Sequence, residues 1–390
     1  MVALQLLIHD ALAIFAAKAV RTFCYGFLGI VLPVYLGELG LDATGVGAAV
    51  TLTLLGSATL TWAIRGPAVR FGARAALTGL SALSGVAAIL FLLSPEPWVV
   101  VIAAMIGNVA VGTGETGPFL AVEQVVLSRA VAAPRLTAVL SFYNLIGYGL
   151  AALGALGAGT LPYRSLFGIF LAASVLQALA YQAVPGIARD RAATRPSGAG
   201  STPLIRRMAA LFALDSFAGG FVLQSLVAYF LHARYGLDLS ALGITFAVAQ
   251  LLTALSLLLA VPLASRFGLL PTMVVSHLAS NVFLIAIAAA PTAPMAVGLL
   301  WLRHLLSQMD VPTRQAYVMA VVEDHERETA ASLTNLTRTL AQAVSPALTG
   351  WVMAALAMSA PFVVGGGLKI AYDLLLWTTF RHVKLRELQR

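Results

Sequence analysis

The sequence has very few charged residues and almost no cysteine. Only 10% of its 390 residues are charged and 60% are hydrophobic, whereas a soluble domain carries about 25% charged residues. Cys24 is the one cysteine, which excludes an internal disulfide framework and a cysteine-based metal cluster. The composition therefore predicts a protein that crosses a membrane many times, with Cys24 as a small packing residue.

Several motifs of chemical activity are also missing. The sequence contains no G-x-x-x-x-G-K-S/T phosphate loop, so we expect no built-in ATPase. It contains no H-E-x-x-H motif and no serine-nucleophile motif, and its six histidines are scattered. We therefore expect a protein that is not an enzyme and that holds no metal and no cofactor.

Apolar runs long enough to cross a membrane as helices, for which about 20 residues are needed, follow one another along the whole chain. Lys18 and Arg21 interrupt the first run and no basic segment precedes it, so we expect a retained helix rather than a cleaved signal peptide. No alternating strand pattern is present, which makes the chain an all-α membrane protein. The twelve predicted transmembrane helices span residues 11–36, 44–64, 74–93, 97–126, 137–160, 164–184, 207–231, 241–264, 269–290, 294–321, 330–356 and 360–380.

Basic residues are distributed unevenly between the two sets of connections. With the N-terminus in the cytoplasm, the inside segments hold sixteen Lys and Arg residues, and the outside loops hold only Arg164 and Arg234. Such a bias marks the cytoplasmic side, so we expect both termini in the cytoplasm and the chain in a bacterial-type cytoplasmic or inner membrane. The net charge of +8 is thus a topology signal and does not indicate a nucleic-acid partner.

The chain divides into two related halves. Residues 185–206 form the longest polar connection, whose Gly, Ser, Pro and Arg content is typical of a flexible cytoplasmic linker. It separates an N-terminal six-helix half, residues 1–184, from a C-terminal six-helix half, residues 207–390. Landmarks recur between the halves at an offset of 196 residues, which predicts an internal repeat. They are GLD at 40–42 and 236–238, RFG at 70–72 and 266–268, and Pro95 and Pro291.

Two of the predicted cytoplasmic loops carry related basic motifs. They read RGPAVRFGAR at residues 65–74 and VPLASRFG at residues 261–268. With the layout of six plus six helices, they resemble the G-x-L-A-D-R-x-G-R loop motif of the major facilitator superfamily (MFS), although Val69 and Ser265 occupy its acidic position. The resemblance implies two pseudo-symmetric halves and a small-molecule transporter working by alternating access. It also implies gating roles for Arg70 and Arg266.

The resemblance implies that helices 1, 4, 7 and 10 line a central cavity, and most deep charges of the sequence lie there. Ionisable residues in membrane segments are costly and mark functional sites by default. In GTGETGPFLAVEQ, residues 112–124, Glu115 and Glu123 are eight residues apart and roughly on one helix face. Desolvation disfavours the charged form of a carboxylate at the depth of Glu115, which makes it our first candidate for proton coupling. A fixed ion pair with Arg21 or Lys18 is the alternative, and Glu123 is either a second proton carrier or a solvated, loop-pairing carboxylate.

Helix 10 contributes a second set of charges in QMDVPTRQ, residues 308–315. Asp310 and Arg314 are four residues apart, the spacing at which an acid and a base meet on one helix face. Asp310 is therefore a proton-coupling candidate and Arg314 a substrate contact, unless they form only an internal salt bridge. Arg303 lies seven residues before Asp310 on the same stripe, without an acid four residues away, and is the better candidate for binding a substrate anion.

Helices 1, 4 and 7 add further candidates. Arg21 is placed to contact substrate or Glu115, and Lys18 either contacts substrate or extends its ammonium group toward the cytoplasm. Asn108, seven residues before Glu115, is a cavity hydrogen-bonding group or a packing residue, and Asp215 is a gate or a packing charge.

Charges outside these four helices have simpler interpretations. Arg338 gives helix 11 a polar side, which could equally be a structural network. Lys369 and Asp373 in helix 12 have the spacing of a simple pair.

We therefore expect a secondary active transporter that moves a small organic solute, and the family resemblance implies proton-coupled efflux because many similar short chains look like exporters. The near alternative is proton-coupled uptake of a sugar or organic anion, and the far alternative is a receptor or scaffold that transports nothing. Among the cavity candidates four cations face two acids, which favours an anionic or zwitterionic substrate over a lipophilic cation. They are Lys18, Arg21, Arg303 and Arg314 against Glu115 and Asp310. We expect the protein to function as a monomer in the lipid bilayer.

Overall fold

The computed structural model describes residues 2–109, 117–130, 133–184, 203–321 and 327–381. Within these ranges the chain is helical and contains no strand. In chain order the helices are α1 (Val2–Glu38), α2 (Ala43–Ala63), α3 (Arg65–Leu93), α4 (Pro97–Ile106), α5 (Pro118–Ala130), α6 (Ala133–Gly157), α7 (Tyr163–Gln182), α8 (Pro203–Gly220), α9 (Gln224–Tyr235), α10 (Leu239–Phe267), α11 (Leu269–Ala288), α12 (Ala293–Ser307), α13 (Asp310–Val321), α14 (Arg327–Ala355) and α15 (Ala360–Phe380). Nine helical segments in the described ranges are long and apolar enough to cross a membrane.

Three predicted helices are not continuous, which corrects the spans 97–126, 207–231 and 294–321. The first is replaced by α4 and α5, the second by α8 and α9, and the third by α12 and α13. Proline and glycine account for the breaks, since Pro118 opens α5, Gly220 ends α8, and Pro312 lies in the first turn of α13. All three broken helices belong to the set expected to line the cavity.

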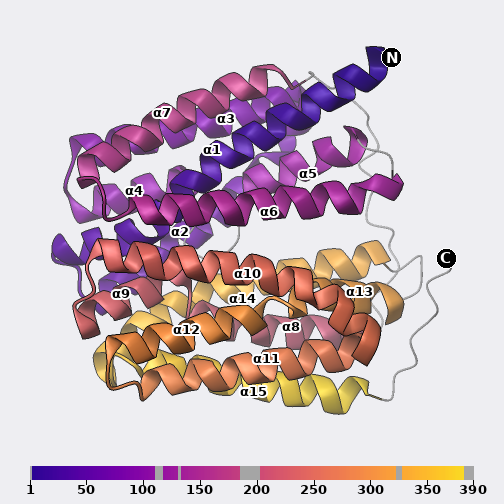
Figure 1. The fold of residues 1–390 in the computed structure, drawn as a ribbon. Coiled ribbons are helices and arrows are strands. Elements are labelled where there is room, and N and C mark those ends of the chain that lie inside the picture. The colour runs from indigo at the N-terminus through magenta and orange to yellow at the C-terminus, as the bar shows by residue number, and fades with distance from the viewer. Residues whose placement is uncertain (1, 110–116, 131–132, 185–202, 322–326, 382–390) are drawn as a thin grey trace.

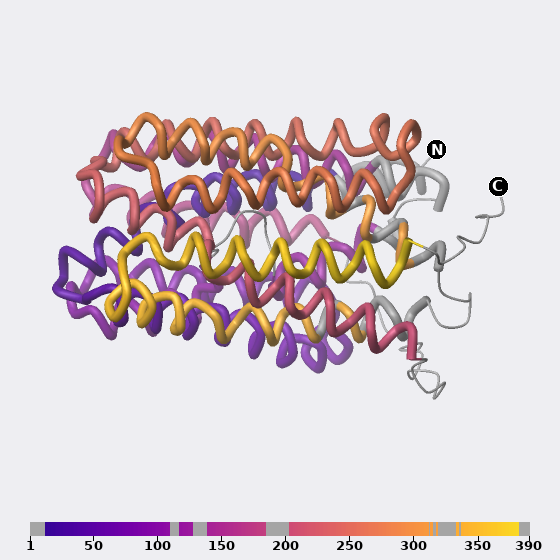
Figure 2. Tube along the Cα trace, turned by 90° about the horizontal axis from the view of Figure 1, so that it is seen from below, coloured from indigo at the N-terminus to yellow at the C-terminus, as the bar shows by residue number. Residues whose placement is uncertain are grey.

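The helices form two bundles that lie side by side (Figure 1). The helices α1 to α7 make up one bundle, and α8 to α15 make up the other. The view at right angles shows that both bundles run along the same long axis (Figure 2). The start of α1 and the end of α15 lie at the same end of this axis. The predicted linker, residues 185–206, lies mostly outside the described residues.

The repeat predicted from the sequence has a counterpart in the local structure. Asp42 caps α2 by accepting a hydrogen bond from the amide of Gly45 at 2.8 Å, and Asp238 caps α10 through the amide of Ala241 at 2.8 Å. Gly72 has φ 87° and ψ 164°, and Gly268 has φ 90° and ψ 160°. Only glycine adopts this region readily, so the RFG motif makes the same sharp bend in both halves.

The two bundles are in close contact at one end, which holds connections 39–42, 158–162 and 236–238 and which we name the outer end after its predicted location. There a Cβ on Gly47 would overlap the carbonyl oxygen of Pro346, and one on Gly243 would overlap that of Ala155. Such glycines let backbones approach closely. These contacts, α2 against α14 and α6 against α10, form what we call the outer seam. The amide of Ala347 also donates to Thr51 Oγ1 across it at 2.8 Å.

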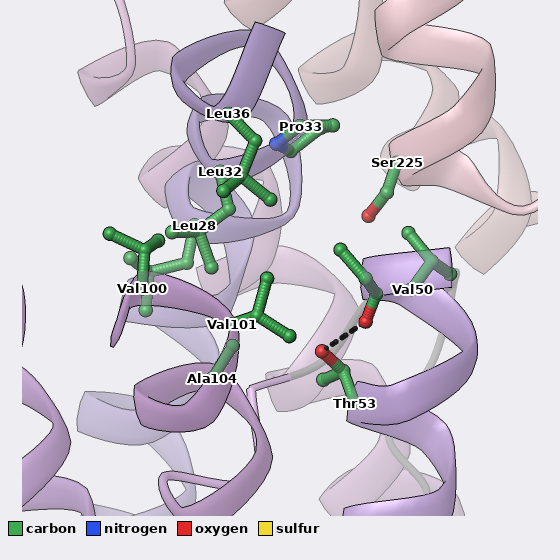
Figure 3. Close-up of a pocket in the computed structure, with 11 residues that line it drawn as sticks. Leu28, Leu32, Pro33, Leu36, Val50, Thr53, Val100, Val101, Ala104 and Ser225 are labelled. Atoms are coloured by element: carbon green, nitrogen blue, oxygen red, sulfur yellow. Dashed lines mark hydrogen bonds between the residues drawn. The ribbon is translucent and has the colours of Figure 1, made fainter. Parts of the chain in front are cut away.

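A small apolar pocket lies beside the outer seam (Figure 3). It has a volume of about 20 Å³ and is lined mainly by aliphatic side chains of α1, α2 and α4, such as Leu28, Val50 and Val101, with Ser225 of α9 facing them. Because a single water needs about 10–15 Å³, this space holds at most about one water. It is therefore a packing gap in the seam and too small for a solute.

Candidate functional site

A cavity of about 580 Å³ lies between the two bundles. Small-molecule sites usually enclose about 300–1,000 Å³, so it is large enough for a solute. Its lining includes the three helix breaks, at Asn108, at Val222 and Leu223, and at Gln308. Non-helical backbone at membrane depth is tolerated where it lines a polar cavity, and broken helices in corresponding positions of two halves mark transporter binding sites.

Asp310 and Arg314 form the ion pair that their spacing predicts. Arg314 Nη1 lies 2.5 Å from Asp310 Oδ2, and both residues line the cavity. The same Nη1 is 3.4 Å from Asp215 Oδ2 on α8, so the pair is part of a larger network. The interpretation of an isolated internal salt bridge is therefore wrong.

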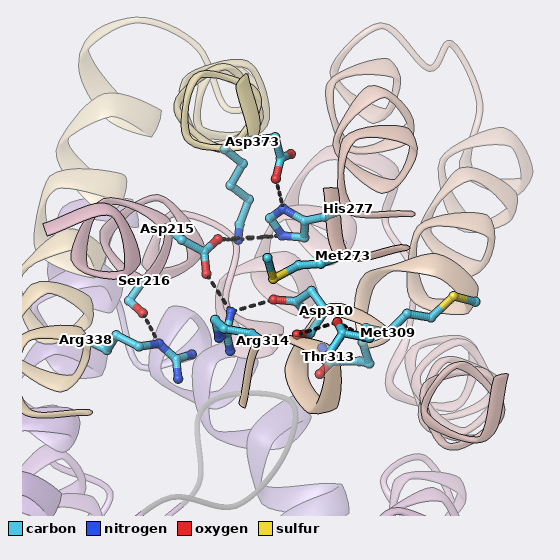
Figure 4. A network of polar contacts seen from close by, with 12 residues as sticks. Asp215, Ser216, Met273, His277, Met309, Asp310, Thr313, Arg314, Arg338 and Asp373 are labelled. Carbon is cyan, nitrogen blue, oxygen red and sulfur yellow. Dashed lines mark hydrogen bonds and ion pairs between the residues drawn. The ribbon is translucent and has the colours of Figure 1, made fainter. Parts of the chain in front are cut away.

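Asp215 is the centre of this network (Figure 4). Besides Arg314, Lys369 Nζ donates to its Oδ1 at 2.6 Å, and His277 Nε2 lies 3.6 Å from the same oxygen. Asp215 is buried, with 5% of its surface exposed, and it lines the cavity. The sequence suggested a gate or a packing charge, whereas the structure places Asp215 in the cavity wall.

His277 and Asp373 complete the network and were missed as site residues. His277 Nδ1 lies 2.7 Å from Asp373 Oδ1, and Asn281 Nδ2 donates to Asp373 Oδ2 at 3.0 Å. Lys369 and Asp373 thus each bind a different partner, in place of the simple pair that their spacing suggested. For His277 the available sequence signal was its spacing of four residues from Asn281, which gives α11 a polar stripe. We name the group the C-half cluster; it comprises Asp215, His277, Asp310, Arg314, Lys369 and Asp373.

A second cluster of buried charge lies in the other bundle. Arg21 Nη1 and Nη2 donate to the two oxygens of Glu123 at 3.0 and 2.7 Å. Tyr143 and Tyr181 each donate a hydroxyl hydrogen to Glu123 at 2.5 Å, and Gln177 donates to the Tyr181 hydroxyl at 3.1 Å. We name these five residues the N-half cluster.

The N-half cluster is closed off from the cavity. Glu123 has no exposed surface, so the prediction of a solvated or loop-pairing carboxylate is wrong. The described side chains that line the cavity include neither Arg21 nor Glu123. Arg21 is held by Glu123 and lies 4.5 Å from the ring centre of Phe119. Its expected contact with Glu115 falls outside the described residues.

Lys18 and Asn108 line the cavity from the N-terminal half. Lys18 is 2% exposed and its Nζ lies 4.2 Å from the ring centre of Tyr143. Asn108 Nδ2 donates to the Tyr25 hydroxyl at 3.4 Å. Because α4 ends at Ile106 and Asn108 has a left-handed φ of 50°, the predicted helical stripe through Asn108 is wrong although the residue reaches the cavity.

Two arginines of the C-terminal half face the cavity and have no carboxylate partner among the described residues. Arg303 lines it, and its Nε is buried with no hydrogen-bond partner. Arg338 also lines it, and its Nε donates to Ser216 Oγ at 3.0 Å. No ion pair found among the described residues includes either arginine. The stripe predicted for Arg303 and Asp310 is broken between α12 and α13, but both residues line the cavity.

The remaining predicted residues lie elsewhere. Glu115, the first candidate for proton coupling, is outside the described residues. Arg70 and Arg266 are exposed, and their guanidinium groups lie 5.1 and 5.3 Å from the ring centres of Phe71 and Phe267. Their equivalent surroundings agree with the repeat, while their gating role stays a prediction.

Positive charge dominates the described part of the cavity wall. Five cationic side chains line it against two carboxylates. They are Lys18, Arg303, Arg314, Arg338 and Lys369 against Asp215 and Asp310. Side-chain amides, among them Asn108, Gln124 and Asn144, supply hydrogen-bonding groups. The wall is thus suited to a polar solute that carries negative charge.

Part of the chain matches a known protein family, and nearly all of it matches a known membrane protein. Residues 208–389 match the Major Facilitator Superfamily. An uncharacterised membrane protein of Saccharomyces cerevisiae is 22% identical over 421 residues, which cover 95% of this chain and 94% of that protein.

Solved structures agree in fold over nearly the whole chain. A mutant of the nucleoside transporter NupG superposes with a TM-score of 0.77 at 15% identity, covering 95% of this chain and 99% of NupG. The inward-open xylose transporter XylE from E. coli superposes with a TM-score of 0.73 at 14% identity, covering 97% of this chain and 98% of XylE. Residues 208–389 are thus similar to the Major Facilitator Superfamily, and the chain as a whole shares the fold of the solved transporters NupG and XylE, in agreement with the broken helices around a polar cavity.

Proposed function

We propose that the protein is a secondary active transporter that moves a small polar organic solute by alternating access and couples its movement to protons. The observation that carries this proposal is the charged cavity of about 580 Å³ between two repeat-related bundles. The outer seam closes one end of the bundles, and a state in which that seam opens would expose the same cavity to the other side. We further propose that both termini are cytoplasmic, that the chain crosses the membrane twelve times, and that it acts as a monomer.

The proposed substrate is a hydroxylated organic anion. The excess of cations in the wall supports a negatively charged solute, and the side-chain amides support one with hydroxyl groups. NupG and XylE, which share the fold, transport nucleosides and xylose. Arg303, Arg314, Lys18 and Asn108 are the proposed substrate contacts.

Asp310 is the proposed proton-coupling residue within the described cavity, and Glu115 keeps that role as a proposal from the sequence. The four hydrogen bonds and full burial of Glu123 support a structural role for it and for Arg21. Asp215, Arg70 and Arg266 are proposed to control opening, Asp215 from the cavity wall and the two arginines from the cytoplasmic loops.

The direction of transport follows from the sign of the solute's charge. An inside-negative potential of 100 mV is worth about 2.3 kcal/mol per charge, or roughly fifty-fold in concentration. An anion leaves a cell with this potential, whereas its entry requires a co-transported cation. A proton-coupling site in a cation-lined cavity therefore favours uptake of a sugar acid or similar anion together with protons. Efflux, the first prediction from the sequence, is the second candidate.

The test uses purified protein in liposomes with an imposed pH gradient of either sign. Uridine, D-xylose and D-glucuronate are supplied in turn, and labelled solute and internal pH are followed together. We expect D-glucuronate and protons to enter together, with both signals reduced in Asp310→Asn and Glu115→Gln. Glu96→Gln, which changes an exposed carboxylate outside the cavity, serves as the matched control. Folded protein that moves none of the three solutes would contradict the proposal and favour a receptor or scaffold.

A further inference from the structure

His277 is the one described histidine that contacts two carboxylates, and it stands at the cavity wall. Its Nδ1 lies 2.7 Å from Asp373 Oδ1, and its Nε2 lies 3.6 Å from Asp215 Oδ1. It is 4% exposed and lines the cavity. Histidine is the side chain whose charge changes most readily near neutral pH, so its place between two acids suggests a proton-binding site.

The charge of the C-half cluster is not balanced while His277 is neutral. Its three carboxylates, Asp215, Asp310 and Asp373, face two cations, Arg314 and Lys369. The cluster then carries one net negative charge, and a proton on the imidazole removes it. Net charge is costly in a region of low dielectric constant, and the His277 imidazole is the group of this cluster that can carry one further positive charge.

The hydrogen bonds around the ring allow two arrangements. Nδ1–H donates to Asp373 Oδ1 in both of them, and Asn281 donates to the other oxygen of Asp373 at 3.0 Å. Nε2 lies 3.5 Å from Lys369 Nζ and 3.6 Å from Asp215 Oδ1. A neutral ring accepts at Nε2 from the Lys369 ammonium, and a protonated ring donates from Nε2 to Asp215.

Lys369 and a protonated His277 compete for one oxygen. Lys369 Nζ donates to Asp215 Oδ1 at 2.6 Å, which is the same oxygen that faces His277 Nε2. Lys369 also repels an imidazolium at this distance, and it lines the cavity. A proton on His277 would therefore weaken the contact between Asp215 and the Lys369 ammonium, which lines the cavity and could then meet a solute anion.

Positive charges on the other helices packed around α11 oppose a further positive charge on His277. Arg303 on α12 and Arg338 on α14 add positive charge at the cavity wall, and Arg314 on α13 reaches the same Asp215. The remaining neighbours are neutral: the Tyr372 ring on α15 stands 5.8 Å from the His277 ring, and His304 on α12 bonds its own backbone. An anion near these arginines would offset their charge and so favour the proton.

We propose that His277 is the group of the C-half cluster that holds the coupled proton, and that its protonation releases Lys369. Asp310 then takes part in coupling through Arg314, which contacts both Asp310 and Asp215. The proposal rests on the proposed function for its transport consequence but not for the site itself. By linkage, a proton that improves anion binding is itself bound more tightly when the anion is present. Anion and proton then travel in the same direction, which agrees with uptake.

The site is tested first without any solute, by NMR of protein in nanodiscs labelled with nitrogen-15 at histidine. Between about pH 5 and about pH 9 we expect one imidazole signal to change from neutral to protonated. That signal should be absent from His277→Gln, present in His232→Gln, and show a smaller protonated fraction at a given pH in Asp373→Asn. A His277 signal that stays neutral or stays charged over this range overturns the proposal, whatever the transport assay shows.

The second test separates coupling from movement of the solute. In liposomes that contain His277→Gln, we expect exchange of labelled for unlabelled D-glucuronate to persist, while accumulation driven by a pH gradient falls at least tenfold. His232→Gln, a change far from the cavity at the outer end, should match the wild type. Full gradient-driven accumulation in His277→Gln contradicts the inference. A wild type that moves no solute contradicts the proposed function instead, and the NMR result still decides the site. If His277→Gln does not fold, Asp373→Asn replaces it in the liposome test, and the smaller protonated fraction of one signal in Asp373→Asn identifies His277 in the NMR test.

Discussion

The two bundles hold buried clusters of similar composition that are arranged differently. In the N-half cluster one carboxylate, Glu123, accepts four hydrogen bonds from Arg21, Tyr143 and Tyr181. In the C-half cluster one carboxylate, Asp215, is shared by Arg314, Lys369 and His277, two of them at distances of 3.4 and 3.6 Å. The first arrangement has every oxygen saturated and lies off the cavity. The second has longer contacts, and five of its six residues line the cavity, so a proton or an anion can rearrange it.

The largest expected effect comes from breaking the N-half cluster. Arg21→Gln leaves the charge of Glu123 buried without its ion-pair partner, and such a loss costs about 3–5 kcal/mol. We expect a large fall in folded yield and in thermal stability in detergent. The double variant Arg21→Met with Glu123→Leu should recover much of both, because it removes both charges. Arg21→Gln protein as stable as Arg164→Gln, in which an exposed arginine is changed, would show that the cluster is not structural.

The matching change in the C-half cluster should affect transport more than stability. Asp215→Asn frees Lys369 and Arg314, but both line the cavity, where water and solute can reach them. We expect folded protein whose gradient-driven accumulation falls about tenfold or more, within the usual range of coupling between sites. Thermal unfolding and accumulation are measured on the same preparation. A loss of folding as severe as that of Arg21→Gln would remove the distinction between the clusters.

A smaller effect is expected at the outer seam. In Gly47→Leu the new side chain would overlap Pro346, and overpacking of this kind costs about 1–3 kcal/mol. The population should shift toward a state in which the seam is open, seen as a longer distance between spin labels at Thr44 and Leu348. Gly79→Leu is the matched control, since a Cβ on that helical glycine meets nothing within 4 Å. Equal distances in both variants would indicate that the seam does not separate.

The smallest effect is expected at the two loop arginines. Arg70→Gln and Arg266→Gln change exposed residues, so stability should stay within about 0.5 kcal/mol. If these loops control opening, each variant should slow exchange of solute by a few-fold and to a similar degree. Unchanged exchange in both would remove Arg70 and Arg266 from the gating role.

Features set by local sequence could be predicted before the structure was known. Apolar runs located the helices, and the offset of 196 residues anticipated the matching bends at Gly72 and Gly268. Asp310 and Arg314 pair as their spacing requires, because four residues bring two side chains together on one helix. The family resemblance agrees with the match of residues 208–389.

Contacts between distant segments were not predictable in this way. Arg21 and Glu123 are 102 residues apart, and His277 and Asp373 are 96 apart. Helical periodicity gives the face on which a residue lies but not the residue of another helix that meets it. The helix breaks were also missed, although Pro118 and Pro312 at corresponding positions pointed to them. Those breaks explain why stripes drawn through Asn108 and Arg303 failed.

The central claim is that binding of a solute in the cavity draws a proton onto the C-half cluster. Calorimetry of solute binding in two buffers of different ionisation enthalpy counts the protons taken up, using whichever of uridine, D-xylose and D-glucuronate is exchanged in liposomes. We expect uptake close to one proton per bound solute for the wild type and close to none for His277→Gln. Binding without proton uptake in the wild type, or with the same uptake in the variant, would contradict it.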